Sequence, residues 1–140
     1  MEINVLSASS RLELNELLER IAKLKEVQIF DAESTMPELI KFAFWHAKKS
    51  FEEGRNISKK FEIEVLIRAS GCRQIKEAIN KVGVKDPKKI LIGFLGPKER
   101  KEKILEELEA EEQKERGVLR KCEDEFEKKI LEIVELELSD

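Results

Sequence analysis

The chain has 140 residues, which fits a single domain. Apolar residues make up 41% of it and charged residues another 41%, so it can bury a core beneath an unusually charged surface, as thermophile proteins do. The net charge of −3 excludes a protein that is basic overall. Any nucleic-acid site must therefore be local.

Three further features favour a cytoplasmic protein without membrane contact. Cys72 and Cys122 lack CxxC or Cys/His spacing, which favours reduced thiols. No stretch approaches the ~20 apolar residues of a membrane helix. The N-terminus lacks the basic and apolar regions of a signal peptide.

The N-terminal residues predict a strand, a helix and a second strand. Alternation in residues 2–6 favours the first strand, and residues 27–32 favour the second. Between them, Ser10 and Glu13 have the spacing of a capping box. Apolar residues then recur at helical spacing: Leu14, Leu17, Leu18, Ile21 and Leu24.

A longer helix follows the second strand. Thr35 and Glu38 have capping-box spacing, Pro37 fits the first turn, and Gly54 is a suitable end. The apolar positions of this helix are Leu39, Ile40, Ala43, Phe44, Ala47 and Phe51.

Residues 61–67 fit two patterns. Phe61, Ile63, Val65 and Ile67 alternate as in a strand, whereas Glu62, Val65, Leu66 and Ala69 step as in a helix that Ser58 could cap. We favour the helix. A break at Ser70 and Gly71 follows it, and then a short helix that ends at Gly83. This short helix is expected to carry one apolar face of Ile75, Ala78, Ile79 and Val82.

The C-terminal third predicts one strand and two helices. Residues 89–95 are nearly all apolar, which favours a central strand. After a turn at Gly96 and Pro97, residues 98–115 predict a highly charged helix, which Gly117 breaks. The expected anchors are Ile104, Leu105 and Leu108 in that helix, and Leu119, Cys122, Phe126, Ile130 and Ile133 in the last, with Leu131, Val134 and Leu138 on an adjoining face.

This order of elements predicts one α+β (α/β) domain over residues 1–140: a small, mostly antiparallel sheet of three or four strands packed against several helices. The sequence does not predict an enzyme. His46 is the sole histidine, and GxSxG, HExxH and GxxxxGKS motifs are absent. We therefore expect no catalytic residue, cofactor, metal ion or small-molecule substrate.

The most informative stretch, residues 64–79, reads EVLIRASGCRQIKEAI, a helix, a tight break and a second helix. With the KVGV that follows it, this pattern resembles the smallest accessory subunit of the KEOPS complex, the TPRKB-type (PRPK-binding) family, and an archaeal member is expected. The flanking AFWHAKKSFEEG, KKILIGFLG and ILEIVELEL follow the family's order of elements. The likeness is specific over residues 57–84 and weak over residues 98–116.

The resemblance implies a non-catalytic role in tRNA modification. The KEOPS complex makes N6-threonylcarbamoyladenosine in tRNA beside the anticodon. Its small subunit binds the atypical kinase/ATPase subunit and is implicated in binding the 3′ CCA end of tRNA. Such a subunit would act as a tether that holds tRNA to the assembly.

Cations around the break suggest where RNA would bind. The N-terminus of a helix suits a phosphate, Gly71 permits close approach of a backbone, and Gln74 could reach a base edge. The predicted tRNA-binding residues are Lys59, Lys60, Arg68, Ser70, Gly71, Arg73, Gln74 and Lys76. The alternative is that Ser70 caps a helix, Gly71 makes a turn and the cations are solvated surface.

The last helix is apolar over more than one stripe, so one face could bind the kinase. The predicted kinase-interface residues are Ile130, Ile133, Val134, Leu136 and Leu138. The alternatives are a core helix or an edge strand there, with Phe42 and Trp45 as the partner anchors. Two rival functions stay open: a protein-only regulatory module that binds a kinase or self-associates without RNA, and a small enzyme with an unrecognised site.

Overall fold

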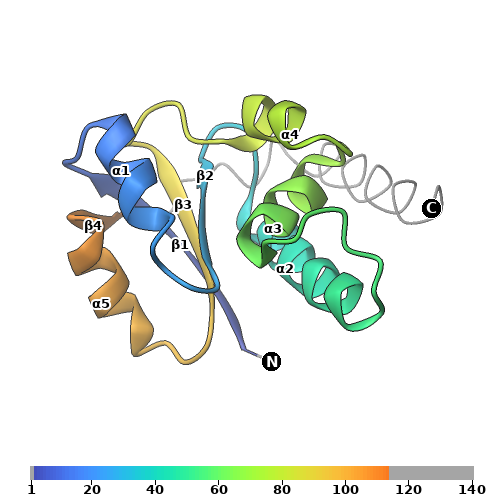
Figure 1. Cartoon of the computed structure of the whole chain (residues 1–140). Helices are drawn as coiled ribbons and strands as arrows, with labels where there is room; N and C mark the ends of the chain where they lie inside the picture. Colours follow the sequence, from blue (N-terminus) through green and yellow to red (C-terminus); the bar gives the residue numbers. More distant parts are fainter. Residues whose placement is uncertain (1, 114–140) are drawn as a thin grey trace.

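A four-stranded antiparallel sheet with helices on both faces organises the chain (Figure 1). The structure is a computed structural model, and it describes residues 2–113. The elements in chain order are β1 (Ile3–Ser10), α1 (Leu14–Ile21), β2 (Val27–Asp31), α2 (Pro37–Glu52), α3 (Phe61–Ser70), α4 (Ile75–Val82), β3 (Ile90–Leu95), α5 (Arg100–Glu107) and β4 (Ala110–Gln113). The predicted α+β class is confirmed.

The strand order is β2-β3-β1-β4, so β3 lies inside the sheet as its apolar sequence predicts. Two residue pairs show the register on either side of β3. Leu95 of β3 lies opposite Ile3 of β1, and Phe94 lies opposite Val27 of β2. The fourth strand pairs with the far end of β1, with Ala110 opposite Ser10.

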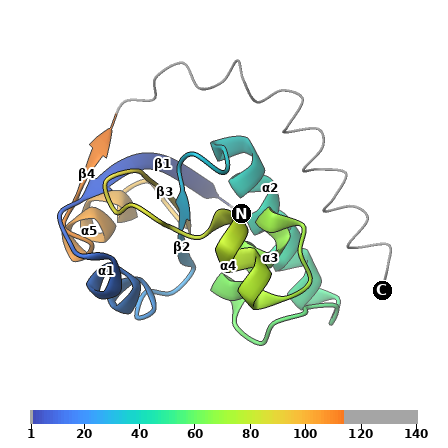
Figure 2. The same ribbon diagram turned by 90° about the horizontal axis from the view of Figure 1, so that it is seen from above.

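Helices α2, α3 and α4 lie on one side of the sheet, and α1 and α5 on the other (Figures 1 and 2). Alternate residues of β3 therefore enter two separate cores. Leu91 and Leu95 pack in the cluster that includes Phe44 of α2, whereas Ile92 and Phe94 pack in the cluster that includes Leu17 of α1. Every residue of β3 is buried as a result.

Gly93 lets α2 approach this central strand closely. A Cβ atom built at Gly93 would lie 2.7 Å from Cε2 of Phe44 and 2.8 Å from Cγ2 of Ile40. Both distances are shorter than carbon atoms tolerate, so the two side chains occupy the space that a larger residue would need.

Within residues 2–113, both outer strands of the sheet carry polar or charged groups along their edges. On β2, the side-chain carbonyl of Gln28 accepts a hydrogen bond from the backbone N–H of Ile29, and its amide donates to the backbone carbonyl of Glu62. On the opposite side, the described residues of β4 include two exposed glutamates, Glu111 and Glu112.

Both predicted capping boxes are wrong. Ser10 ends β1 instead of starting a helix, because its hydroxyl donates to the backbone carbonyl of Leu108 at 2.6 Å and thereby ties β1 to the end of α5. The N-caps of α1 and α2 are Glu13 and Met36, and neither makes a side-chain capping hydrogen bond. Pro37 does occupy the first turn of α2, as predicted.

The charged stretch after Pro97 is only partly helical. α5 ends at Glu107, a left-handed residue at Glu109 (φ 46°) reverses the chain, and β4 follows. The sequence AEEQ of β4 has no apolar alternation, so nothing in it predicted a strand. The predicted anchors Ile104, Leu105 and Leu108 are buried.

The ambiguous segment at residues 61–67 is helical, because α3 lies among other helices instead of beside a strand edge. It packs between α2 and α4, and Val65, Leu66 and Ile67 are all buried. None of the helices in residues 2–113 has both the length and the apolar character that crossing a membrane requires.

We predict that Gly93→Ala lowers the free energy of unfolding by about 1–3 kcal/mol, because the added methyl group overlaps Phe44 and Ile40. Urea denaturation measures this loss. Ser7→Ala, on half-buried Ser7 of β1, is the control and should change the value by less than about 0.5 kcal/mol. Equal stability of the wild type and Gly93→Ala would show that α2 does not lie this close to β3.

Candidate nucleic-acid interface

A left-handed turn at Gly71 joins α3 to α4. Gly71 has φ 75°, a conformation that L side chains rarely adopt, and its N–H donates to the carbonyl of Ile67. The Ser70 hydroxyl donates to the same carbonyl at 2.9 Å and accepts from the N–H of Cys72 at 3.0 Å. Ser70 is buried and builds the turn, so the prediction that its hydroxyl contacts RNA needs correction.

Arg73, Gln74 and Lys76 surround the start of α4, and all three are exposed. Gln74 is the N-cap of α4 and makes no side-chain capping hydrogen bond. The first amides of α4 carry the partial positive charge of a helix N-terminus. Two cationic side chains, a side-chain amide and this helix end therefore share one small surface.

Two isoleucines extend this surface along α4. Ile75 is 44% exposed and Ile79 is 48% exposed, although their spacing predicted a core face. Among the helices of residues 2–113, α4 is the outermost of its layer and packs on α3 through Ala78 and Val82, whereas Ile75 and Ile79 are exposed. The face that the sequence showed as one apolar stripe is thus divided between core and surface.

Lys59 and Lys60 lie at the opposite end of α3 from Arg73 and Lys76. The ten residues of α3 separate these pairs by about 15 Å at 1.5 Å per residue. Both lysines are exposed, and Lys60 Nζ donates to the backbone carbonyl of Ala22 at 3.3 Å. The predicted cations therefore form two groups instead of one ring.

Arg68 lies inside the protein, so its prediction as an RNA contact also needs correction. It is fully buried and pairs with the equally buried Glu64, with 2.9 Å between Arg68 Nη2 and Glu64 Oε2. Glu64 also accepts hydrogen bonds from the backbone N–H groups of Ile57 and Ser58 at 2.9 and 2.7 Å. Arg68 in turn donates to the carbonyl of Arg55 at 3.3 Å. This buried pair holds the loop that carries Lys59.

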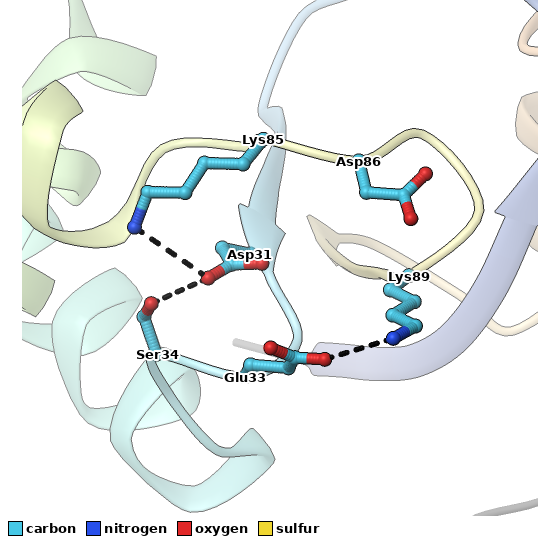
Figure 3. A pocket seen from close by; sticks show the side chains of 6 residues that line it. All are labelled: Asp31, Glu33, Ser34, Lys85, Asp86 and Lys89. Atoms are coloured by element: carbon cyan, nitrogen blue, oxygen red, sulfur yellow. Dashed lines mark hydrogen bonds and ion pairs between the residues drawn. The ribbon is translucent and has the colours of Figure 1, made fainter.

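A pocket of about 350 Å³ lies at the end of β2 and the α4–β3 loop (Figure 3). Its lining residues are Asp31, Glu33, Ser34, Lys85, Asp86 and Lys89.

The two lysines of this pocket pair with two of its three carboxylates, those of Asp31 and Glu33. Lys89 Nζ lies 3.0 Å from Glu33 Oε1, and this hydrogen bond raises the pKa of Lys89. Buried Asp31 accepts from Ser34 and lies 3.8 Å from Lys85 Nζ. The lining has three carboxylates and two ammonium groups, and this excess of negative charge disfavours a phosphate.

The predicted kinase-interface residues 130–138 lie outside the described residues. Within residues 2–113, no group of three or more histidine, cysteine or acidic residues is arranged to hold a metal ion. His46 is half-buried, with its ring 4.3 Å from that of Phe42. The described part of the chain defines a small α+β protein with an exposed apolar and cationic surface at the α3–α4 turn.

The proteins to which the chain is similar are archaeal Cgi121 proteins. It is 39% identical over 57 residues to the KEOPS complex subunit Cgi121 of Pyrococcus abyssi, a match that covers 41% of this chain and 33% of the relative. It is 47% identical over 47 residues to the regulatory protein Cgi121 of Methanocaldococcus jannaschii, covering 34% of this chain and 32% of the relative. No family model matches.

The chain therefore spans about a third of the length of each relative that it matches. These matches confirm the predicted resemblance to the archaeal KEOPS small subunit. One relative is named as a complex subunit and the other as a regulatory protein, so neither name describes a catalyst.

We predict that Arg68→Met lowers the free energy of unfolding by about 3–5 kcal/mol, because it leaves the Glu64 carboxylate buried without its partner. The double variant Glu64→Leu/Arg68→Met should be less destabilised than the sum of the two single variants. Urea denaturation of all three measures this coupling. Additive losses would show that the two side chains do not form a functional pair.

Proposed function

We propose that the protein is a non-catalytic subunit of a KEOPS complex that binds the atypical kinase/ATPase subunit and the 3′ CCA end of tRNA. In this role it supports the N6-threonylcarbamoyladenosine modification of tRNA. The similarity to a named KEOPS subunit supports membership of the complex. The observation that carries the RNA contact is the surface formed by Arg73, Gln74, Ile75, Lys76 and Ile79.

This surface has the groups that a single-stranded RNA end requires. Arg73 and Lys76 can neutralise phosphates, which supplies affinity without reading sequence. The Gln74 amide can donate to and accept from a base edge. Ile75 and Ile79 offer apolar surface to the faces of bases. Burying apolar surface contributes about 25 cal/mol of binding free energy per Å².

Lys59 extends this proposed path to the other end of α3. Because Lys59 and the α4 start lie about 15 Å apart along α3, a short single strand could contact both groups. Gly71 lies at the α4 end of this path, where it has no side chain that could obstruct an RNA backbone. Arg68 and Ser70 would support this path indirectly: Arg68 holds the loop that carries Lys59, and Ser70 holds the turn at Gly71.

The mechanism follows from tethering. A tRNA held at its acceptor end and at the modification site has a second attachment to the assembly, which raises its effective concentration there. Activity of the complex would rise without a catalytic group from this chain.

A protein-only regulatory module is the second candidate function. The exposed Ile75 and Ile79 favour it, because paired aliphatic side chains on a helix can also dock a protein. One relative is named only as a regulatory protein. RNA binding assays separate the two functions.

We predict that Arg73→Glu/Lys76→Glu weakens tRNA binding by about tenfold or more, since each substitution removes a charge-assisted contact. Each lost phosphate contact should also reduce the salt slope by about 0.7, so the double variant should reduce it by about 1.4. Filter binding across a salt series measures both effects. Removal of the CCA end should weaken wild-type binding as well.

The matched control is Lys98→Glu/Lys103→Glu, because both lysines are exposed, and Lys103 lies on α5, which covers the other face of the sheet from α4. This control should bind tRNA like the wild type. Equal affinity for tRNA with and without the CCA end would contradict the end-specific contact. If both charge-reversal variants lost the same tRNA affinity, the loss would reflect the net charge of the protein and not this surface.

We also predict that Ile133→Glu/Val134→Glu abolishes co-purification of the kinase/ATPase subunit while tRNA binding survives. A charge in a desolvated interface costs several kcal/mol, enough to separate a complex of ordinary affinity. Retained co-purification would place the kinase contact elsewhere on the chain.

A further inference from the structure

The elements of residues 2–113 cover the α2 side of the sheet incompletely. α3 contacts β2, whereas α2 contacts β3 and β1, so the two helices follow the strand order across this face (Figure 2). The helix that packs on β4 is α5, which lies on the opposite face. Leu6 and Ala8 of β1 face α1 and α5 and are buried, whereas Ser7 and Ser9 face the α2 side and are half-buried. On this side, β1 and β4 therefore lack full cover from the described residues.

A row of side chains on α2 lies next to this uncovered part of the sheet. Phe44 of α2 contacts Phe61 of α3, with 5.9 Å between their ring centroids. Leu39 precedes Phe44 by five residues, which places it about 140° around the helix and so away from α3. Leu39, Phe42 and His46 form this row, here called the α2 row. Because α3 flanks α2 on one side, the α2 row faces the side of β1 and β4.

The first residues of the α2 row are buried more deeply than their described neighbours explain. Met36, Leu39 and Phe42 form an apolar cluster that is separate from both main cores. Leu39 is 1% exposed, although no apolar residue from another described element belongs to this cluster. Side chains one turn away on the same helix leave a leucine partly accessible to water. The cluster therefore requires further apolar cover.

The described chain ends at the strand beside this uncovered part. Ala110 of β4 lies opposite Ser10 and Gln113 lies opposite Ser7, so β4 runs toward the end of β1 where Val5 packs with the main α2 cluster. Neighbouring strands lie about 4.8 Å apart, and packed helices about 8–10 Å apart. Residues 114–118 can span about 17 Å when extended, which is enough to bring residue 119 alongside α2.

The sequence beyond this connection has the apolar spacing that the cluster requires. Leu119, Cys122, Phe126 and Ile130 recur at the spacing of one helical face. Residues 119–130, here called the C-terminal segment, would span about 18 Å as a helix. The α2 row extends over seven residues, or about 10 Å, so a helix of this length could cover all of it.

The charges of the two parts are complementary. Residues 123–127 read EDEFE, with four acidic side chains around Phe126 and no basic one. Residues 41–49 of α2 read KFAFWHAKK, with three lysines and no acidic residue. Lys49 lies near the end of the α2 row, with its Nζ 4.8 Å from the centroid of the Trp45 ring. Opposite charges beside an apolar contact favour this pairing over others.

We propose that the C-terminal segment forms a helix that packs beside α2, over β1 and β4, with its apolar face against the α2 row. This inference does not depend on the proposed function, because it concerns two parts of one chain. Ile130, which the sequence assigns to the kinase interface, would then face α2. Val134 and Leu138 lie on the adjoining helical face and would remain available to a partner.

A second copy of the protein fits the α2 row less well. If the rows of two molecules met, the three lysines of one residue 41–49 stretch would lie near the same three lysines of the other. Like charges across an interface oppose association. The C-terminal segment brings acidic side chains instead, and its tether to β4 keeps its effective concentration at the α2 row high.

Disulfide trapping in the full chain tests this contact. Cys72→Ser leaves Cys122 as the one thiol, and Leu39→Cys, Phe42→Cys and His46→Cys are then added singly. A disulfide requires Cβ atoms about 3.5–4.5 Å apart. Mild oxidation should therefore link Cys122 to at least one of the three positions within a monomer, which mass spectrometry of unreduced peptides detects.

Leu18→Cys in the same Cys72→Ser background is the matched control, because Leu18 is 43% exposed on α1, on the opposite face of the sheet. This variant should form no link to Cys122. Circular dichroism verifies that each variant is folded.

Thiol labelling gives a second measurement that needs no new cysteine. In the Cys72→Ser chain, Cys122 should react with iodoacetamide at least about tenfold more slowly in the native state than in urea, because the docked segment must open first. Phe126→Glu should remove this protection. Val134→Glu, about 80° around the helix from Phe126, should keep it.

Three results would overturn the inference. Links to none of the three α2 positions in folded variants, with Cys122 labelled as fast as in urea, would show that the C-terminal segment does not cover the α2 row. An equal link to Leu18→Cys would show that the segment has no fixed position. Links between two molecules instead of within one would make a second copy the occupant of the row. None of these results bears on tRNA or kinase binding, so the proposed function would stand.

Discussion

Strand β3 is buried on both faces of the sheet, and this constraint decides where the helices lie. Its alternate side chains need apolar cover on two sides, which α2 and α3 supply on one side and α1 and α5 on the other. Because Gly93 has no side chain, α2 lies unusually close to β3 at this position. Once α2 and α3 occupy one face, α4 packs on α3 from outside. Its outward isoleucines are a consequence of this stacking order.

The elements with strong periodicity could be predicted from the sequence, and those fixed by distant partners could not. The apolar run at residues 89–95 is sufficient to predict a central strand, and Gly71 is sufficient to predict the break after α3. In contrast, β4 exists because β1 offers an edge for pairing, and its own residues contain no such signal. Ser10 looks like a cap locally, yet its hydroxyl bonds to Leu108, which is 98 residues away.

The candidate site shows the same limit at the level of single residues. The sequence shows how many cationic residues lie near a turn, but it does not show which of them are buried when the helix packs. The cluster of cations near the turn places Arg68 with Arg73 and Lys76, whereas Glu64, four residues before Arg68, predicts an ion pair on the same helix face. Periodicity places Ile75 and Ile79 on an apolar face of α4, but it does not show whether another element packs against that face. In the structure, Arg68 is buried and the two isoleucines are exposed.

The outer strands of the sheet have a consequence for how copies of this protein behave at high concentration. A bare strand edge would recruit the same edge of another molecule and start a chain of hydrogen-bonded copies. Along β4, however, Glu111 and Glu112 would meet their own counterparts, and like charges opposite one another resist pairing. On β2, the Gln28 side chain already occupies a backbone amide. Polymerisation by strand addition is thereby discouraged at both edges of the sheet that residues 2–113 form.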